Sequence, residues 1–118
     1  MIFVIDDDAI MAKCVARACE KCGFKTQIFG DAISAMAAIN DELPEMIFLD
    51  ILLSGPDGFT FLNELVSYSD TMKIPVVVIS SLQFEEKDLA NYGVVAVLDK
   101  AKMRPEEIQD LAREYAGR

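Results

Sequence analysis

The segment Ile2-Phe3-Val4-Ile5-Asp6-Asp7-Asp8 places four consecutive apolar residues directly before three aspartates. An unbroken apolar run of this length indicates a β-strand buried on both faces, because a strand with one wet face would alternate with polar residues. Three further apolar runs end in the same way, namely 46–49 before Asp50, 75–79 before Ser80 and 94–98 before Asp99. We therefore predict four buried strands with polar side chains at their carboxyl ends.

Helical patterns alternate with these strands along the whole chain. Residues 25–29 form a partly polar fifth strand, which is typical of a sheet edge. The helices are expected at 9–21, 32–40, 59–68, 85–92 and 106–115. This alternation predicts an α/β fold, a doubly wound (βα)5 parallel sheet with helices on both faces.

Local signals mark several helix ends. Gly23 suits a left-handed residue after the first helix, Asp31 suits the N-cap of the second, and Pro105 suits the first turn of the last. The segment 55–58, Gly-Pro-Asp-Gly, has the composition of a turn before the third helix. The Met, Phe and Ile residues of the helices are expected in the core.

Composition narrows the classes of function. The chain has 118 residues, 53% of them hydrophobic, and a net charge of −9 from 11 basic and 20 acidic residues. That length fits one domain over 1–118. The negative charge disfavours direct binding to nucleic acid or to anionic membranes. No apolar run approaches the roughly 20 residues of a membrane-spanning helix, so we expect a cytoplasmic protein.

Cysteine usage points to packing rather than chemistry. Cys14, Cys19 and Cys22 have the spacing of three iron–sulfur ligands, but the chain has no fourth cysteine and no histidine. With Met11, Val15 and Ala18 they fall at the spacing of one helix face, which predicts an apolar stripe facing the core. Without histidine, any chemistry must use carboxylates, hydroxyls and lysine.

The polar residues after the strands form the candidate site. Ligands of open parallel sheets bind beyond the carboxyl ends of the strands. We therefore expect the following side chains to gather there: Asp6, Asp7, Asp50, Ser80, Ser81 and Lys100. Asp8 fits a helix N-cap better, and Asp99 is expected to face away. Lys102 and Arg104 compete with Lys100, but only Lys100 keeps the expected spacing from Gly93.

Clustered carboxylates require a counter-charge. Asp6, Asp7 and Asp50 would repel one another strongly in a partly desolvated pocket, and a hard divalent cation relieves that repulsion. We expect Mg2+, with Mn2+ as a possible substitute. The open coordination positions of such an ion suit phosphoryl oxygens, and Lys100 and Ser80 can contact two more. One carboxylate could then act as the nucleophile and form an aspartyl phosphate.

These residues resemble the receiver domain of two-component response regulators, in particular chemotaxis-type regulators. The resemblance rests on Ile-Asp-Asp-Asp at 5–8, Phe-Leu-Asp at 48–50, Asp-Gly at 57–58, Val-Ile-Ser at 78–80 and Val-Leu-Asp-Lys at 97–100. It implies a flavodoxin-like fold with strand order 2-1-3-4-5. It also implies that Asp50 is the phospho-acceptor, that Asp6, Asp7, Asp50 and the backbone carbonyl of Leu52 hold the metal, and that Ser80, Ser81 and Lys100 contact the phosphoryl group.

The resemblance also implies a regulatory role rather than an enzymatic one. A sensor histidine kinase or phosphotransfer protein would phosphorylate Asp50 in a Mg2+-dependent reaction. The output would pass through the face built from the fourth helix, fifth strand and fifth helix to a downstream protein or domain. A monomer or weak dimer is expected.

Four features depart from the family pattern. Ala101 stands where a proline, often in a cis peptide bond, usually follows the lysine, and we predict a trans bond because a non-proline cis bond costs about 2.5 to 4 kcal/mol. Ser54 replaces the acceptor-loop proline, with Pro56 nearby. Val97 fills a switch position that is commonly aromatic. The segment 80–93, which contains the expected fourth helix, is short for the family.

Two other functions remain open. A receiver of this kind could act as a docking module without phosphorylation, with an intact but idle acidic site. Alternatively, Asp6-Asp7-Asp8 resembles the Asp-x-Asp motif of haloacid-dehalogenase-type phosphatases, in which Asp6 would be the nucleophile and Asp8 the acid–base.

Overall fold

A computed structural model describes residues 1–53, 57–81 and 86–117 of the chain. Five strands form one parallel sheet in the order β2-β1-β3-β4-β5, which confirms the predicted fold. The strands are β1 (Ile2–Ile5), β2 (Thr26–Phe29), β3 (Met46–Asp50), β4 (Val76–Ser80) and β5 (Val94–Asp99). Every residue of the three inner strands is buried, and β2 is an edge strand as expected.

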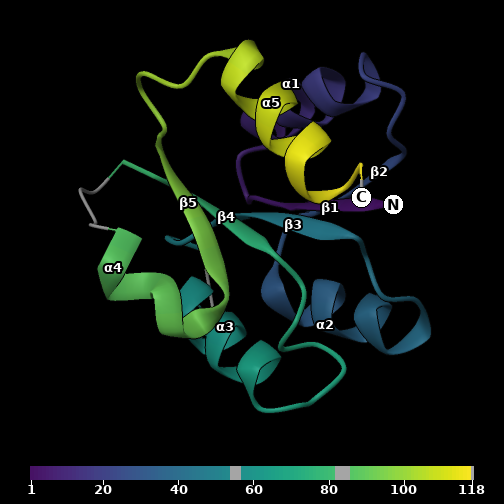
Figure 1. The fold of residues 1–118 in the computed structure, drawn as a ribbon, viewed down its shortest axis with the longest axis vertical. Coiled ribbons are helices and arrows are strands. Elements are labelled where there is room, and N and C mark those ends of the chain that lie inside the picture. The colour runs from purple at the N-terminus through teal and green to yellow at the C-terminus, as the bar shows by residue number, and fades with distance from the viewer. Residues whose placement is uncertain (54–56, 82–85, 118) are drawn as a thin grey trace.

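Helices cover both faces of the sheet (Figure 1). They are α1 (Ala9–Glu20), α2 (Ala32–Asp41), α3 (Gly58–Val66), α4 (Glu86–Leu89) and α5 (Pro105–Tyr115), with a 3-10 turn η1 (Ala90–Tyr92) after α4. Helices α1 and α5 pack together on one face, and α2 and α3 lie on the other (Figure 1). Each face has its own buried apolar cluster, so strand side chains of both orientations are covered.

Helix ends follow the local signals. Gly23 has φ +88°, Asp31 caps α2 by accepting a hydrogen bond from the Ser34 N–H, and Pro105 begins α5. Helical residues fill 86–92 of the predicted 85–92, but only Glu86–Leu89 are α-helical, and Ala90–Tyr92 form the 3-10 turn η1, which ends at the left-handed Gly93. The peptide bond between Lys100 and Ala101 is trans, as predicted. The expectations for Ser54, Gly55, Pro56 and residue 85 lie outside the described residues.

Two predictions about the core are wrong. Cys14 is exposed, because the buried residues of α1 are Ala12, Val15, Ala16, Ala18 and Cys19; the predicted stripe therefore holds at Val15, Ala18 and Cys19 but not at Cys14. Alanine has no bulky side chain, so Ala12 and Ala16 let α1 lie close to the sheet. Ile10 and Ile33 are 78% and 68% exposed, so not every large apolar helix residue is in the core.

Among the described residues, no helix combines the length and the apolar character needed to cross a membrane.

Candidate functional site

Carboxylates from two strands converge at the carboxyl edge of the sheet. Ile5 of β1 pairs with Leu49 of β3, so Asp6 and Asp50 follow at the same level of neighbouring strands. One carboxylate oxygen from each of Asp6, Asp7 and Asp50 lies within 4.8 Å of the others. Asp6 and Asp50 are buried, whereas Asp7 is exposed. The cluster therefore combines two desolvated acids with one at the solvent boundary.

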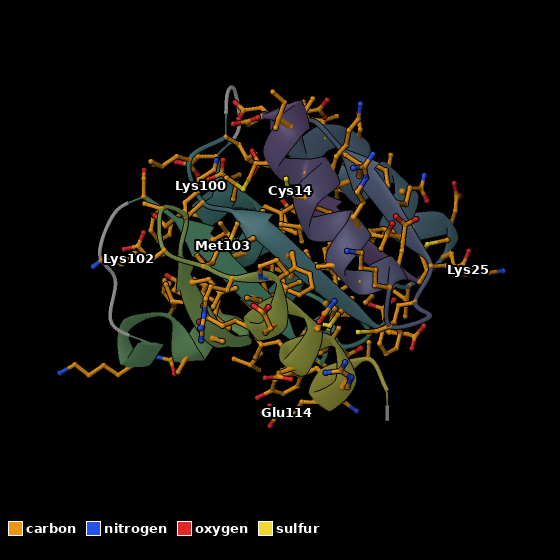
Figure 2. All side chains as sticks on the ribbon, turned by 90° about the horizontal axis from the view of Figure 1, so that it is seen from above. Cys14, Lys25, Lys100, Lys102, Met103 and Glu114 are labelled. Atoms are coloured by element: carbon orange, nitrogen blue, oxygen red, sulfur yellow. The ribbon has the colours of Figure 1, made fainter. Side chains whose placement is uncertain are left out.

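Lys100 lies between the two buried acids. Its Nζ is 3.2 Å from Oδ2 of Asp50 and 3.4 Å from Oδ2 of Asp6. The two competing cations are placed differently. Arg104 pairs with Glu107 at the start of α5, and Lys102 is exposed, further toward the outer edge of the molecule than Lys100 (Figure 2). Of the three basic residues in this loop, Lys100 alone reaches the cluster.

Backbone N–H groups hold the two buried carboxylates, those of Asp6 and Asp50, in place. Oδ1 of Asp6 accepts from the Asp8 N–H at 2.9 Å, and Oδ1 of Asp50 accepts from the Leu52 N–H at 3.0 Å. Such bonds to the residue two positions ahead are a common property of aspartate in turns. Asp8 itself accepts from the Ile10 N–H and caps α1, as expected.

The loop that carries Lys100 is fixed in the same manner. The Lys100 N–H donates to the Ser80 carbonyl at 2.9 Å, and the Asp99 carboxylate accepts from the Ala101 N–H at 2.9 Å. Asp99 was expected only to face away from the site. Its hydrogen bond to the Ala101 N–H was not predicted from the sequence. The residue type could have indicated it, because an aspartate often accepts a hydrogen bond from the backbone N–H two residues ahead in a turn.

Gly58 has a structural role that the motif alone did not explain. A Cβ built on Gly58 would lie 2.7 Å from Cα and 2.8 Å from the carbonyl oxygen of Ile51, the residue after Asp50. The Gly58 N–H donates to that same carbonyl at 3.1 Å. Glycine is therefore required here because α3 begins in direct backbone contact with the acceptor loop.

The remaining predicted residues lie around this centre. Ser80 ends β4 and is fully buried, while Ser81 is exposed beside it. Val97 is half-buried and packs against the core cluster on the α2–α3 face. Leu52 follows Asp50 in the loop, with its side chain 47% exposed.

The electrostatics of the cluster are unbalanced. Burial, together with the nearby Asp50 charge, raises the pKa of Asp6 to about 6, although the Asp8 N–H and Lys100 act in the opposite direction. Desolvation lowers the pKa of Lys100, but its hydrogen bond to Asp50 and the charge of Asp6 outweigh that effect and raise it. Oδ2 of Asp6 is buried and accepts no hydrogen bond. One lysine thus leaves the acids incompletely neutralised.

This donor set fits a hard divalent cation. Carboxylate oxygens are the ligands that Mg2+ and Mn2+ prefer, and Oδ2 of Asp6, which accepts no hydrogen bond and is 3.4 Å from Nζ of Lys100, can coordinate one. The exposed Asp7 leaves one side of the cluster facing solvent.

Comparison with known families agrees with this arrangement. The family described as the response regulator receiver domain matches residues 2–113. The chain belongs to this family. Domains of this kind are regulatory parts of two-component response regulators.

Curated relatives of this receiver include the phosphate regulon transcriptional regulatory protein PhoB of Escherichia coli K12, 34% identical over 85 residues. Another is the DNA-binding response regulator MtrA of Mycobacterium tuberculosis H37Rv, 30% identical over 80 residues. The matches cover 72% and 68% of this chain but only 37% and 34% of those proteins. The receiver therefore corresponds to about a third of each relative.

Solved structures show the same fold. The receiver domain of NtrX from Brucella abortus superimposes with a TM-score of 0.86 at 30% identity, covering 99% of this chain and 98% of that one. The Mn(2+)-bound response regulator Rcp1 has a TM-score of 0.79 at 23% identity, covering 95% and 91%. At 23% identity, the similarity to Rcp1 shows a shared fold and nothing more.

Proposed function

We propose that this receiver, acting as one domain over 1–118, accepts a phosphoryl group on Asp50. The donor is a phosphohistidine of a sensor histidine kinase or a phosphotransfer protein. The observation that carries the proposal is the position of Asp50 at the centre of the site, in contact with Lys100 and within 4.8 Å of two other acids. Asp6 has both kinds of neighbour as well, but its contact with Lys100 is longer, at 3.4 Å against 3.2 Å, and Asp50 is the acid that ends the Phe-Leu-Asp motif.

Four groups would hold the metal, namely the carboxylates of Asp6, Asp7 and Asp50 and the backbone carbonyl of Leu52. Mg2+ is the proposed ion and Mn2+ can replace it, because both accept hard oxygen ligands. When bound, the ion supplies positive charge to the oxygens of the transferring phosphoryl group. The buried Oδ2 of Asp6 accepts no hydrogen bond, which supports this assignment.

The transfer itself needs no further protein nucleophile. A carboxylate oxygen of Asp50 attacks phosphorus, the P–N bond to histidine breaks, and its electron pair stays on the imidazole nitrogen. Lys100, already 3.2 Å from Asp50, neutralises charge on the phosphoryl oxygens. Hydrolysis later restores the Asp50 carboxylate and releases inorganic phosphate. The domain thus catalyses only its own phosphorylation and dephosphorylation.

Phosphate on Asp50 would draw the Ser80 hydroxyl toward it, with Ser81 beside the same loop. Because Ser80 ends β4 and its carbonyl accepts from Lys100, movement there reaches β5 directly. The α4–β5–α5 face then carries the signal to a downstream protein or domain. Val97 on β5 replaces the usual aromatic, so backbone and helix packing transmit the change.

The charge and composition of the chain bear on its location and its partners. We propose a cytoplasmic domain, monomeric or weakly dimeric, that contacts neither membrane nor nucleic acid through this segment, since its net charge is −9. PhoB and MtrA are named as a transcriptional and a DNA-binding regulator. If the whole protein binds DNA, that contact lies outside the segment described by this sequence.

The test is phosphorylation by acetyl phosphate. The chain and its Asp50→Asn variant are incubated with Mg2+ and acetyl phosphate, and intact masses are measured. A phosphoryl adduct on the wild type that is lost in Asp50→Asn and in the presence of EDTA supports the proposal. An adduct that survives Asp50→Asn but disappears in Asp6→Asn would indicate phosphatase-type chemistry. Absence of adduct with acetyl phosphate and with kinase donors would favour a docking module.

A further inference from the structure

A groove between α2 and α3 is separate from both the phosphorylation site and the proposed output face. The two helices lie beside each other on one face of the sheet (Figure 1). One hollow of about 460 Å³ lies toward their N-terminal halves and a second of about 270 Å³ toward their C-terminal ends. Both hollows are lined by Met36, Asn40 and Glu64, so they lie next to each other along the same pair of helices, and together they are called the α2–α3 groove.

The N-terminal part of the groove is apolar. Its lining includes Ile33, Met36 and Phe61. Ile33 is 68% exposed, although a large aliphatic side chain on a helix normally packs inward. Leu43 and Tyr68, at 45% and 58% exposure, extend the apolar surface into the C-terminal part. This is the type of surface that accepts apolar anchor residues of a partner.

The charges around the groove all have one sign. The ionised side chains that line it are Asp41, Glu42, Glu64 and Asp70. Among the residues that the structure describes, no lysine or arginine lines either hollow. The groove therefore combines an apolar floor with an acidic rim.

Helix dipoles add to this negative potential. The C-terminal ends of α2 and α3 both meet the second hollow, and neither helix has a basic residue in its last turn. Asp41 and Glu42 instead place carboxylates at the negative end of α2, an arrangement that is locally unfavourable. A positively charged group of a bound partner would offset this unfavourable interaction at the end of α2.

We propose that the α2–α3 groove binds a basic amphipathic helix of a partner protein. Apolar side chains of that helix would fill the floor beside Ile33 and Met36, and its lysines or arginines would pair with Glu64 and the acids at the end of α2. Helix α2 has 10 residues, about 15 Å of axis, which matches a partner helix of two to three turns. The complementary charge identifies a cationic protein segment rather than a second copy of this acidic chain.

The test uses a synthetic helical peptide of about 14 residues with leucines at positions spaced by three and four and lysines elsewhere. Binding to the isotopically labelled chain is followed by amide chemical shifts. We expect saturable shifts confined to α2 and α3, with binding that weakens as salt is added. A peptide of the same leucine pattern with glutamate in place of lysine should not bind.

Matched variants separate the groove from general attraction to an acidic protein. Ile33→Ser and Glu64→Lys should each weaken peptide binding at least roughly fivefold, a difference of about 1 kcal/mol. Ile10→Ser and Glu20→Lys make the same changes at exposed positions outside the groove and should alter binding less than twofold.

Three outcomes would overturn the proposal. The first is equal weakening by the groove and control variants, and the second is a peptide footprint on another face. The third is a shift of the α2–α3 resonances when the chain alone is concentrated, which would assign the groove to a second copy.

Discussion

Nζ of Lys100 lies 3.2 Å from Oδ2 of Asp50, although 50 residues separate them along the chain. The contact crosses from the end of β3 to the loop after β5, with β4 between those strands in the sheet. It exists because the carbonyl of Ser80, at the end of β4, accepts a hydrogen bond from the Lys100 N–H and brings the loop back over the sheet edge. Three strand ends thereby meet in one polar site.

Replacing Lys100 by an uncharged residue should reduce both the rate of phosphorylation and the stability of the fold. Lys100→Met leaves two buried carboxylates without their counter-charge, so we expect the metal-free chain to lose roughly 1 to 3 kcal/mol of unfolding free energy. Formation of the phosphoryl adduct should slow by roughly 10²-fold, because the charge that faces the phosphoryl group is gone. Denaturant titration and time-resolved mass spectrometry measure the two effects. Lys102→Met, outside the cluster, is the control, and equal effects of both variants would contradict the assignment.

Without a metal ion, the folded chain should be more stable when the Asp6 carboxyl group is protonated than when it is ionised. The pKa of Asp6 is raised from its ordinary 3.8 to about 6, so the folded chain binds this proton more tightly than the unfolded chain does. Stability without metal should therefore fall as pH rises through the interval between these values. Asp6→Asn keeps an oxygen for the Asp8 N–H, and it should raise the unfolding free energy at pH 7 in EDTA by roughly 1 to 3 kcal/mol.

The Asp6→Asn variant also distinguishes repulsion among the carboxylates from loss of metal binding. Mg2+ should stabilise the wild type in thermal melts, because it binds only the folded site, and it should stabilise Asp6→Asn much less. Asp57→Asn is the matched control, since asparagine caps a helix as well as aspartate does and Asp57 lies at the N-cap of α3. A destabilised Asp6→Asn in EDTA would show that the site tolerates its charges without a metal.

Gly58 should be intolerant of even one added carbon. In Gly58→Ala the new Cβ would meet the backbone of Ile51 at 2.7 Å, so either α3 or the loop after Asp50 must move. We expect a loss of roughly 1 to 3 kcal/mol in stability and slower phosphorylation. Gly30→Ala provides the control, because a Cβ there has no heavy atom within 4 Å and should be neutral. Unfolding curves and adduct rates of the two variants give the comparison.

The cysteines should differ in reactivity despite their shared helix. Burial raises the pKa of the Cys19 thiol to about 12, so little thiolate forms at neutral pH, and its side chain is covered. Cys14 is exposed. Iodoacetamide at pH 7.5 should label Cys14 within minutes and Cys19 only after denaturation, as peptide mass spectrometry would reveal. Labelling of Cys19 at the rate of Cys14 in the native chain would place α1 differently from the structure.

Several features could be predicted from residues alone. The apolar runs ending at Ile5 and Leu49 gave the inner strands, because a strand covered on both faces must be apolar at every position. The joint placement of Asp6, Asp50 and Lys100 followed from the rule that strand ends of a parallel sheet share one edge. The N-cap at Asp31 and the first-turn position of Pro105 depend only on local backbone geometry, and the structure has both as expected.

Other features could not be obtained in this way. The exposure of Cys14 and of Ile33 depends on which face of each helix turns toward the sheet, and that face carries small residues such as Ala12 in α1 and Ala35 in α2. The change from α-helix to a 3-10 turn at Ala90 has no signal in the sequence pattern, whereas Gly93 marks where the helical segment ends. The contact between Gly58 and Ile51 is a tertiary approach of two backbones, for which the motif alone gives no reason.

The sequence by itself determined the order of strands and helices and the chemical types at the strand ends, because both depend on short-range periodicity. Only the tertiary structure decided that Asp6 is buried while its neighbour Asp7 is exposed, that an oxygen of Asp6 has no hydrogen bond, and that an acidic groove separates α2 from α3. Burial and unsatisfied charge depend on what packs around a side chain, and here the packing partners come from segments tens of residues apart.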